Sequence, residues 1–263
     1  MGKENNQEID KLTLITGQSI IIGRPVISLY QPTLKELGSL GQTNFYSAAV
    51  LLAYPKKVIK LTDESMLEYA TDFDIIMTML RQMDDMSKLN ANITLLLMSL
   101  LFKDYSIKVA GNMLLLEREG EKQIIINSEN YEPIKQAIIQ MFCLEDIMGT
   151  TNTEIKDTDG PMVRRIKEKF KKRHEILAKQ KGGKSNTEND LLSRYMSIVS
   201  IGLHLPLTEL SDYTVYQLFD GYKRAQLKDS FDFYIQRVTS FGCVKKEEKV
   251  VNWQKNLSDT SDD

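Results

Sequence analysis

A glycine-containing loop gives the sharpest match to a chemical motif in this sequence. Residues Ala178–Ser185 follow the relaxed phosphate-loop pattern, with alanine in place of the first glycine. Such a loop would cradle phosphates with backbone N–H groups, while its lysine neutralised charge and its serine held Mg²⁺. That chemistry requires a buried strand directly before the loop, whereas residues 164–181 have the pattern of a charged helix. We therefore interpret the loop as a connection between helices, and we predict no cofactor.

A basic segment contains this loop. Between Gly160 and Lys184 there are ten Lys or Arg residues and two Glu residues, a local net charge of +8, whereas the rest of the chain carries 24 basic and 34 acidic residues. A predicted helix over 161–181 could contact nucleic-acid phosphates, bind an acidic protein or remain solvated. Its apolar residues share one face. No aromatic residues interleave on the basic face to stack on bases.

Other residue types that often carry chemistry are sparse. The two histidines, His174 and His204, and the two cysteines, Cys143 and Cys243, do not have the spacing of zinc ligands. We interpret both cysteines as buried free thiols. The closest carboxylate clusters lie at predicted helix surfaces or caps, where the helix dipole favours acidic residues near N-termini. We therefore expect no catalytic residues, no metal and no enzymatic activity.

The composition is ordinary for a globular protein. The chain has 263 residues, of which 42% are hydrophobic and 27% charged, and its formal net charge is −2. This balance excludes a globally basic nucleic-acid wrapper and a largely disordered chain. The N-terminus lacks the apolar core of a signal peptide, and the longest apolar run, Ile93–Phe102, is about half the length that spans a bilayer. We expect a cytoplasmic protein with no membrane partner.

The hydrophobic periodicities predict an α+β fold that is mostly helical. Small antiparallel sheet elements are expected in the N-terminal part, and helices alone in the C-terminal part. Residues 12–16 and 19–22 are predicted to form a hairpin, with 25–30 as a third strand. Three further strands are predicted at 106–110, 113–117 and 123–127. Helices are predicted to begin near Thr33 and to span 62–69, 72–86, 90–102, 129–143, 161–181, 190–203, 214–241 and 247–257.

Composition also divides the chain into two folded parts. Residues 149–160 contain four Thr, two Asp and one Asn, which is typical of a linker. The predicted organisation is a flexible tail at 1–10, an α+β domain at 11–148, a linker at 149–160, a helical domain at 161–257 and a flexible tail at 258–263.

Two stretches far apart in the sequence carry recognisable motifs. The first is Pro25–Leu37, which reads PVISLYQPTLKEL. The second begins with LTELSDYTVYQLFD at residues 207–220 and continues with Tyr222, Arg224, Gln226, Phe231, Asp232, Gly242 and Trp253. Together they resemble tail-assembly and baseplate proteins of bacteriophages with Gram-positive hosts. The best-fitting members are baseplate or baseplate-hub assembly proteins of Twort-like phages, which have contractile tails.

The resemblance implies a non-enzymatic protein of tail morphogenesis that docks on other tail or baseplate proteins, with a homo-oligomer also possible. Such a protein would lie in the host cytoplasm during assembly and, if structural, in the tail baseplate of the virion. Two alternatives stay open: a tail assembly chaperone absent from the mature virion, and a nucleic-acid-binding protein that uses the basic helix 161–184. The residues predicted to bind a protein partner are basic or aromatic: Arg164, Arg165, Lys169, Lys172, Arg173, Tyr216, Phe219, Tyr222 and Trp253.

Overall fold

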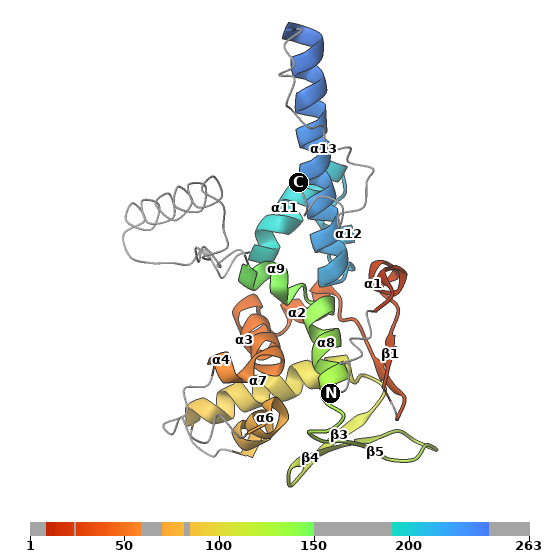
Figure 1. Cartoon of the computed structure of the whole chain (residues 1–263), viewed down its shortest axis with the longest axis vertical. Coiled ribbons are helices and arrows are strands. Elements are labelled where there is room, and N and C mark those ends of the chain that lie inside the picture. Colours follow the sequence, from red (N-terminus) through yellow and green to blue (C-terminus); the bar gives the residue numbers. More distant parts are fainter. Residues whose placement is uncertain (1–8, 24, 59–69, 82–84, 150–190, 242–263) are drawn as a thin grey trace, which may run out of the picture.

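The computed structural model describes residues 9–23, 25–58, 70–81, 85–149 and 191–241, and it confirms the α+β fold class. Two small sheets and most helices form a lower body, and the C-terminal helices rise from it (Figure 1). The strands are β1 (Ile20–Ile22), β2 (Ile27–Leu29), β3 (Ser106–Ala110), β4 (Met113–Glu117) and β5 (Ile124–Ile126). The helices are α1 (Lys11–Thr16), α2 (Leu34–Gly38), α3 (Gln42–Ala53), α4 (Pro55–Val58), α6 (Asp72–Arg81), α7 (Asp85–Leu101), α8 (Glu132–Met141), α9 (Leu144–Gly149), α11 (Leu191–Leu203), α12 (Leu207–Leu210) and α13 (Val215–Phe241).

The first predicted hairpin is wrong, because residues 11–16 form the helix α1. The side chain of Asp10 accepts a hydrogen bond from the Leu12 N–H at 3.1 Å and caps the helix start. Gly17 ends the helix at a φ of 68°, a left-handed conformation that suits glycine. The β-branched residues of α1, Thr13, Ile15 and Thr16, favour a strand, and these caps override that preference. β1 pairs instead with β2, the predicted third strand, with Ile20 opposite Leu29.

The second sheet agrees with the prediction. β3, β4 and β5 are neighbours in that order, and both pairings are antiparallel. Leu114 and Leu116 of β4 are buried, while the side chains between and beside them are exposed or partly exposed. This alternation is the period of two that a half-buried strand requires.

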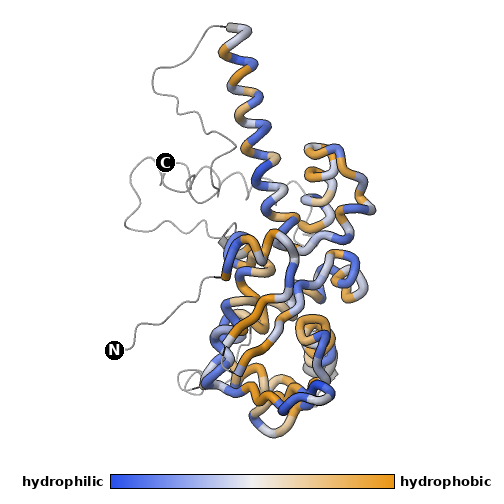
Figure 2. The backbone as a smooth tube through the Cα atoms, turned by 90° about the vertical axis from the view of Figure 1, so that its right-hand side faces the viewer, coloured by the Kyte–Doolittle hydropathy of each residue, from blue (hydrophilic) through white to orange (hydrophobic). Residues whose placement is uncertain are grey.

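The core of the lower body lies between α3, α7 and α8. The rings of Phe45 and Phe142 meet edge to face, with centroids 4.9 Å apart. Tyr131 is also buried, and its hydroxyl donates to the backbone carbonyl of Leu52 at 2.8 Å. The predicted helix 90–102 corresponds to the second part of α7, where Leu97 and Leu101 are buried and Leu96 is exposed. Hydrophobic colouring is concentrated in this body and alternates with hydrophilic colouring along α13 (Figure 2).

The helices that follow the predicted linker share a core with the body. Leu218 of α13 and Val199 of α11 belong to the same buried cluster as Phe45 of α3. The Lys35 backbone N–H also donates to the Ser211 carbonyl at 2.8 Å. Nearly all of the predicted linker and N-terminal tail, the predicted helices 62–69, 161–181 and 247–257, and the tail 258–263 lie outside the described residues. The division into two domains therefore stays a prediction.

In the part of the chain that the structure describes, no helix is both long and apolar enough to cross a membrane.

Candidate protein-docking surface

The structure joins the two motif-bearing stretches of the sequence, Pro25–Leu37 and residues 207–220. Thr33 precedes α2, Thr214 precedes α13, and these two residues form an antiparallel β-bridge. Beside the bridge, the backbone N–H of Leu34 donates to the carbonyl of Tyr213 at 2.8 Å. The starts of two helices, far apart in the sequence, therefore lie side by side. We call this contact the threonine joint.

Each threonine begins its helix with a capping box. The backbone N–H of Thr33 donates to the Glu36 carboxylate at 2.9 Å, and the Thr33 hydroxyl accepts from the Glu36 N–H at 3.3 Å. Thr214 and Gln217 repeat this exchange at 2.7 and 3.3 Å. The Gln217 side-chain amide also donates to the carbonyl of Ile15 in α1 at 2.7 Å. Reciprocal caps of this kind satisfy two backbone donors that a helix start leaves free.

An aromatic cluster packs α11 against α13. The rings of Tyr195 and Tyr222 are stacked, with centroids 3.9 Å apart, and Phe219 meets Tyr195 edge to face at 5.0 Å. Burial raises the pKa of the Tyr195 hydroxyl above its ordinary value. The Tyr222 hydroxyl accepts a hydrogen bond from the side-chain amide of Gln226 at 2.6 Å. Aromatic pairs in these geometries add about 0.5–1.5 kcal/mol each beyond the area that they bury.

Small residues let α11 and α13 approach closely above this cluster. A Cβ placed on Gly221 of α13 would lie 3.5 Å from Val199 Cγ1. A Cβ placed on Gly202 of α11 would lie 3.4 Å from Ala225 Cβ. Because both Val199 and Ala225 are buried, the crossing is well packed as it stands.

Ion pairs connect the exposed side of the same region. Asp220 accepts from Arg224 at 2.7 Å within α13, and Lys223 reaches Asp146 of α9 at 2.7 Å. These side chains are partly exposed, so each pair contributes only about 0.2–1 kcal/mol. The Lys223–Asp146 pair links α13 to α9, and the aromatic cluster supplies more of the stability.

Apolar side chains that this packing does not cover lie on α11 and α12. Ile201 is 75% exposed and Leu207 is 51% exposed, and Ile198 and Leu203 are also exposed. We call these four residues the α11–α12 patch. Ile198 and Ile201 are about one turn apart on α11, and neighbouring exposed apolar side chains often mark a contact with another protein. The sequence analysis missed this patch, although α11 is apolar on more than one face in the sequence.

Residues 184–258 match the family model of the YomV second domain. This family is phage-derived, which indicates a phage protein. The matched YomV-type segment includes α11, α12 and α13, and therefore also the α11–α12 patch and one side of the threonine joint. No curated protein and no solved structure matches the chain.

The predicted partner-binding aromatics of the YomV-type segment lie largely inside the packing. Phe219 is 3% exposed, Tyr222 is stacked on Tyr195, and Tyr216 is partly buried, so that burial raises the pKa of its hydroxyl. The structure therefore shows these rings in an internal role. Their part in partner binding stays a prediction. The other predicted residues lie outside the described residues: Arg164, Arg165, Lys169, Lys172, Arg173 and Trp253.

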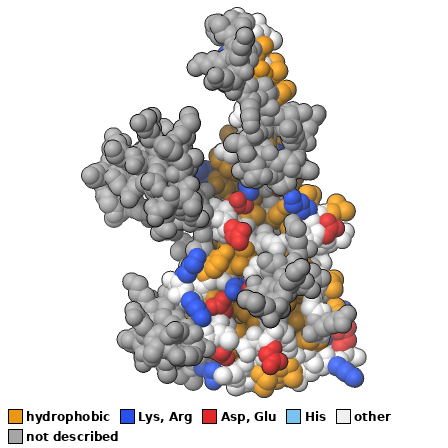
Figure 3. All heavy atoms as spheres, in the orientation of Figure 1, with side chains coloured by type: hydrophobic (Ala, Val, Ile, Leu, Met, Phe, Trp, Pro, Cys, Tyr) orange, Lys and Arg blue, Asp and Glu red, His pale blue; other side chains and the backbone are white. Residues whose placement is uncertain are grey.

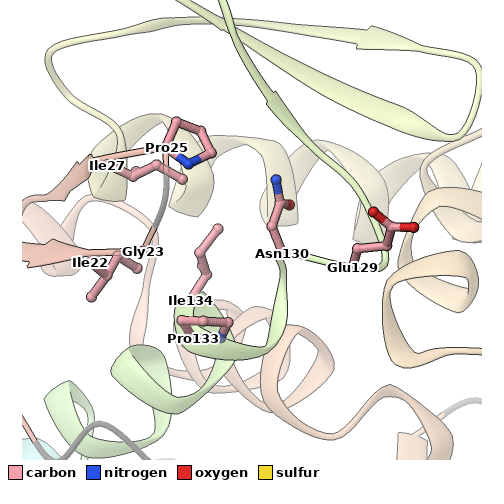
Figure 4. Close-up of a pocket in the computed structure, with 8 residues that line it drawn as sticks. All are labelled: Ile22, Gly23, Pro25, Ile27, Glu129, Asn130, Pro133 and Ile134. Atoms are coloured by element: carbon pink, nitrogen blue, oxygen red, sulfur yellow. The ribbon is translucent and has the colours of Figure 1, made fainter. Parts of the chain in front are cut away.

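A pocket of about 150 Å³ lies between the β1–β2 hairpin and the start of α8 (Figure 4). Its lining is mainly apolar, with Glu129 and Asn130 as the polar members. Asn130 already accepts from the Asn127 N–H and donates to the Ile125 carbonyl, both at 2.8 Å. The Glu129 carboxylate points away from Pro25 and Ile134 (Figure 4). This arrangement offers no converging polar groups to bind a ligand inside the pocket.

Two residues from the sequence analysis have unusual backbone conformations. Cys143 lies between α8 and α9 with a φ of 50°, and His204 follows α11 with a φ of 55°. Cys143 is buried, as predicted, and burial raises the pKa of its thiol to about 12. A thiol with such a pKa is protonated at neutral pH and is a weak nucleophile. Among the described residues, no three His, Cys, Asp or Glu side chains are grouped to hold a metal ion.

Proposed function

We propose that this chain is a non-enzymatic protein of phage tail morphogenesis, a structural component of the contractile-tail baseplate or hub that docks on neighbouring tail proteins. The observation that carries the proposal is the threonine joint. It unites the two stretches that resemble tail proteins through the Thr33–Thr214 bridge. One of these stretches also lies in the segment that matches a phage-derived family.

The α11–α12 patch is the surface that we propose for docking. Its residues are exposed beside a firmly packed joint, so a partner would meet a preorganised surface. Ile201 is the residue to test first because it is the most exposed of the four. Burial of such apolar groups, with a polar rim around them, is the usual anatomy of a protein interface.

Mass spectrometry of purified phage particles, with the tail fraction separated from the heads, tests this proposal. We expect the chain in the tail fraction at a fixed stoichiometry. If the chain is absent from particles but bound to tail proteins in infected-cell lysate, it is an assembly chaperone instead. Absence from both fractions would overturn the tail proposal and return attention to nucleic-acid binding by residues 161–184.

A matched pair of variants tests the surface. Ile201→Asp places a charge in the α11–α12 patch, and Ile21→Asp places the same charge on β1, where Ile21 is 61% exposed. Each gene would complement a phage that lacks the wild-type copy. We expect Ile201→Asp to lose incorporation into tails and Ile21→Asp to retain it. Equal incorporation of both soluble, folded variants would exclude the α11–α12 patch.

A further inference from the structure

The long helix α13 has two unlike halves. Its first half packs into the body through Val215, Leu218, Phe219 and Ala225, all of which are buried. Beyond Ala225, none of the described side chains of α13 is buried. The second half projects past the other described helices (Figure 1), and hydrophobic side chains are visible along its upper end (Figure 3).

A regular apolar stripe runs along this projecting half. Its members are separated by four, three, four and three positions: Leu227, Phe231, Tyr234, Val238 and Phe241. The first four are only partly exposed, and Phe233 beside the stripe is 66% exposed. Alternating steps of three and four are the pattern of a helix that packs along another helix. The described residues do not include a helix on this stripe.

The sequence after α13 contains a second stripe that mirrors the first. Leu257, Trp253 and Val250 lie 15, 11 and 8 positions after Gly242. Leu227, Phe231 and Tyr234 lie 15, 11 and 8 positions before it. In a helical hairpin, residues at equal distances from the turn lie opposite one another. Gly242 is at the centre of this symmetry, as a turn residue would be.

The family match gives a second, independent indication. The YomV-type segment continues beyond α13 and ends at residue 258, directly after Leu257. The residues that mirror α13 are therefore part of the same family unit as α13. Fifteen helical residues rise about 22 Å. The chain after Gly242 is thus long enough to return along the whole projecting half.

We propose that the chain turns at Gly242 and that residues 244–257, which include the predicted helix 247–257, form a helix that packs antiparallel on the projecting half of α13. Gly242 lies at the centre of the connecting turn, which keeps the two stripes in the mirrored register. Trp253 then packs on Phe231 at the centre of the contact. Trp253 would serve the stability of the YomV-type segment rather than bind a partner. This proposal does not depend on a role in the phage tail.

The fluorescence of Trp253 tests the proposal directly, because it is the single tryptophan of the chain. In the full-length protein we expect blue-shifted emission and an acrylamide quenching constant several-fold lower than after unfolding. Phe231→Asp should raise quenching to the unfolded level. Phe233→Asp, next to the stripe, should leave quenching unchanged. An exposed Trp253 in the wild-type protein, or equal effects of the two variants, would overturn the hairpin.

A crosslink distinguishes a hairpin from contact with a second copy. In a Cys243→Ala background, Leu227→Cys with Leu257→Cys should form a disulfide within one chain on mild oxidation. Asp229→Cys with Leu257→Cys is the control, because residue 229 lies on another face of α13. Cys143 is buried and should not compete. A crosslinked dimer in place of the intramolecular bond, together with Trp253 emission that shifts on dilution, would assign the stripe to a second copy and overturn the proposal.

Discussion

The first half of α13, up to Ala225, and its projecting half belong to one continuous helix, yet different interactions stabilise them. We call them the proximal and the distal half. The proximal half starts at a capping box, contributes Phe219 to an aromatic cluster and crosses α11 at Gly221. The distal half is supported within the described residues by local contacts, such as the ion pair of Lys228 with Asp232 at 2.7 Å. Single pairs of this kind on an exposed helix contribute only about 0.3–0.5 kcal/mol.

This difference shows that an apolar residue on a helix has no fixed meaning until its neighbour is known. Phe219 and Phe233 are the same residue type and lie fourteen positions apart, almost four full helical turns, so they are on nearly the same side of α13. Phe219 is enclosed by α11 and the body, whereas Phe233 faces outward. Most helical stability in proteins comes from such tertiary packing rather than from propensity. The two phenylalanines therefore provide a direct comparison of the two halves.

Phe219→Ala should have the largest effect. The substitution leaves a cavity beside Tyr195, and large-to-small changes of buried phenylalanine cost about 3–5 kcal/mol. Urea denaturation followed by circular dichroism measures the free energy of unfolding. Phe233→Ala is the matched control, and an exposed site should change that free energy by less than about 0.5 kcal/mol. Equal losses would mean that the distal half is packed as firmly as the proximal half.

Local patterns in the sequence predicted much of the fold. The strands at 106–110 and 113–117 were found because turn glycines separate short β-rich runs, and Gly111 has a φ of 58° as such a turn requires. The helix at 214–241 was found from its apolar spacing. The error at α1 arose because the helix depends on Asp10 and Gly17 at its ends, while the β-branched Thr13 and Ile15 in its interior favour a strand.

The candidate site was less predictable because it depends on contacts between distant segments. The capping patterns of Thr33 with Glu36 and of Thr214 with Gln217 can be recognised in the sequence. Their pairing in one β-bridge cannot, because no local rule relates them. For the same reason the aromatic residues near 219 were predicted to bind partners. The sequence shows that they are aromatic, but not that Tyr195 already packs on them.

Thr214→Ala should have an intermediate effect. Thr214 at the start of the proximal half and Thr239 in the distal half extend the comparison of the two halves. Thr214 is buried and caps α13, so its loss should lower the free energy of unfolding by about 1–2 kcal/mol. Thr239 is exposed in the distal half, and its hydroxyl donates to the Ile235 carbonyl at 2.9 Å. Thr239→Ala should leave stability unchanged or raise it slightly, because alanine is the better helix former.

Thermal unfolding of both variants, scanned at the same protein concentration, would reveal the contrast. A Tm for Thr214→Ala equal to that of the wild type would show that the threonine joint does not anchor α13.

Gly221→Ala should have the smallest effect on the free energy of unfolding, and it should stabilise the protein. Glycine inside a helix is less stable than alanine by about 0.5–1 kcal/mol. The added Cβ would meet Val199 Cγ1 at 3.5 Å, which is ordinary van der Waals contact, so we expect the free energy of unfolding to rise by about that amount. Gly17→Ala is the control, because Gly17 has a φ of 68° and its added Cβ would meet the side chain of Gln217 at 3.4 Å, so stability should fall. Urea denaturation of the two variants compares them on one scale. Destabilisation by Gly221→Ala would mean that α11 and α13 cross more tightly than these distances indicate, and that the proximal half requires glycine for contact with α11.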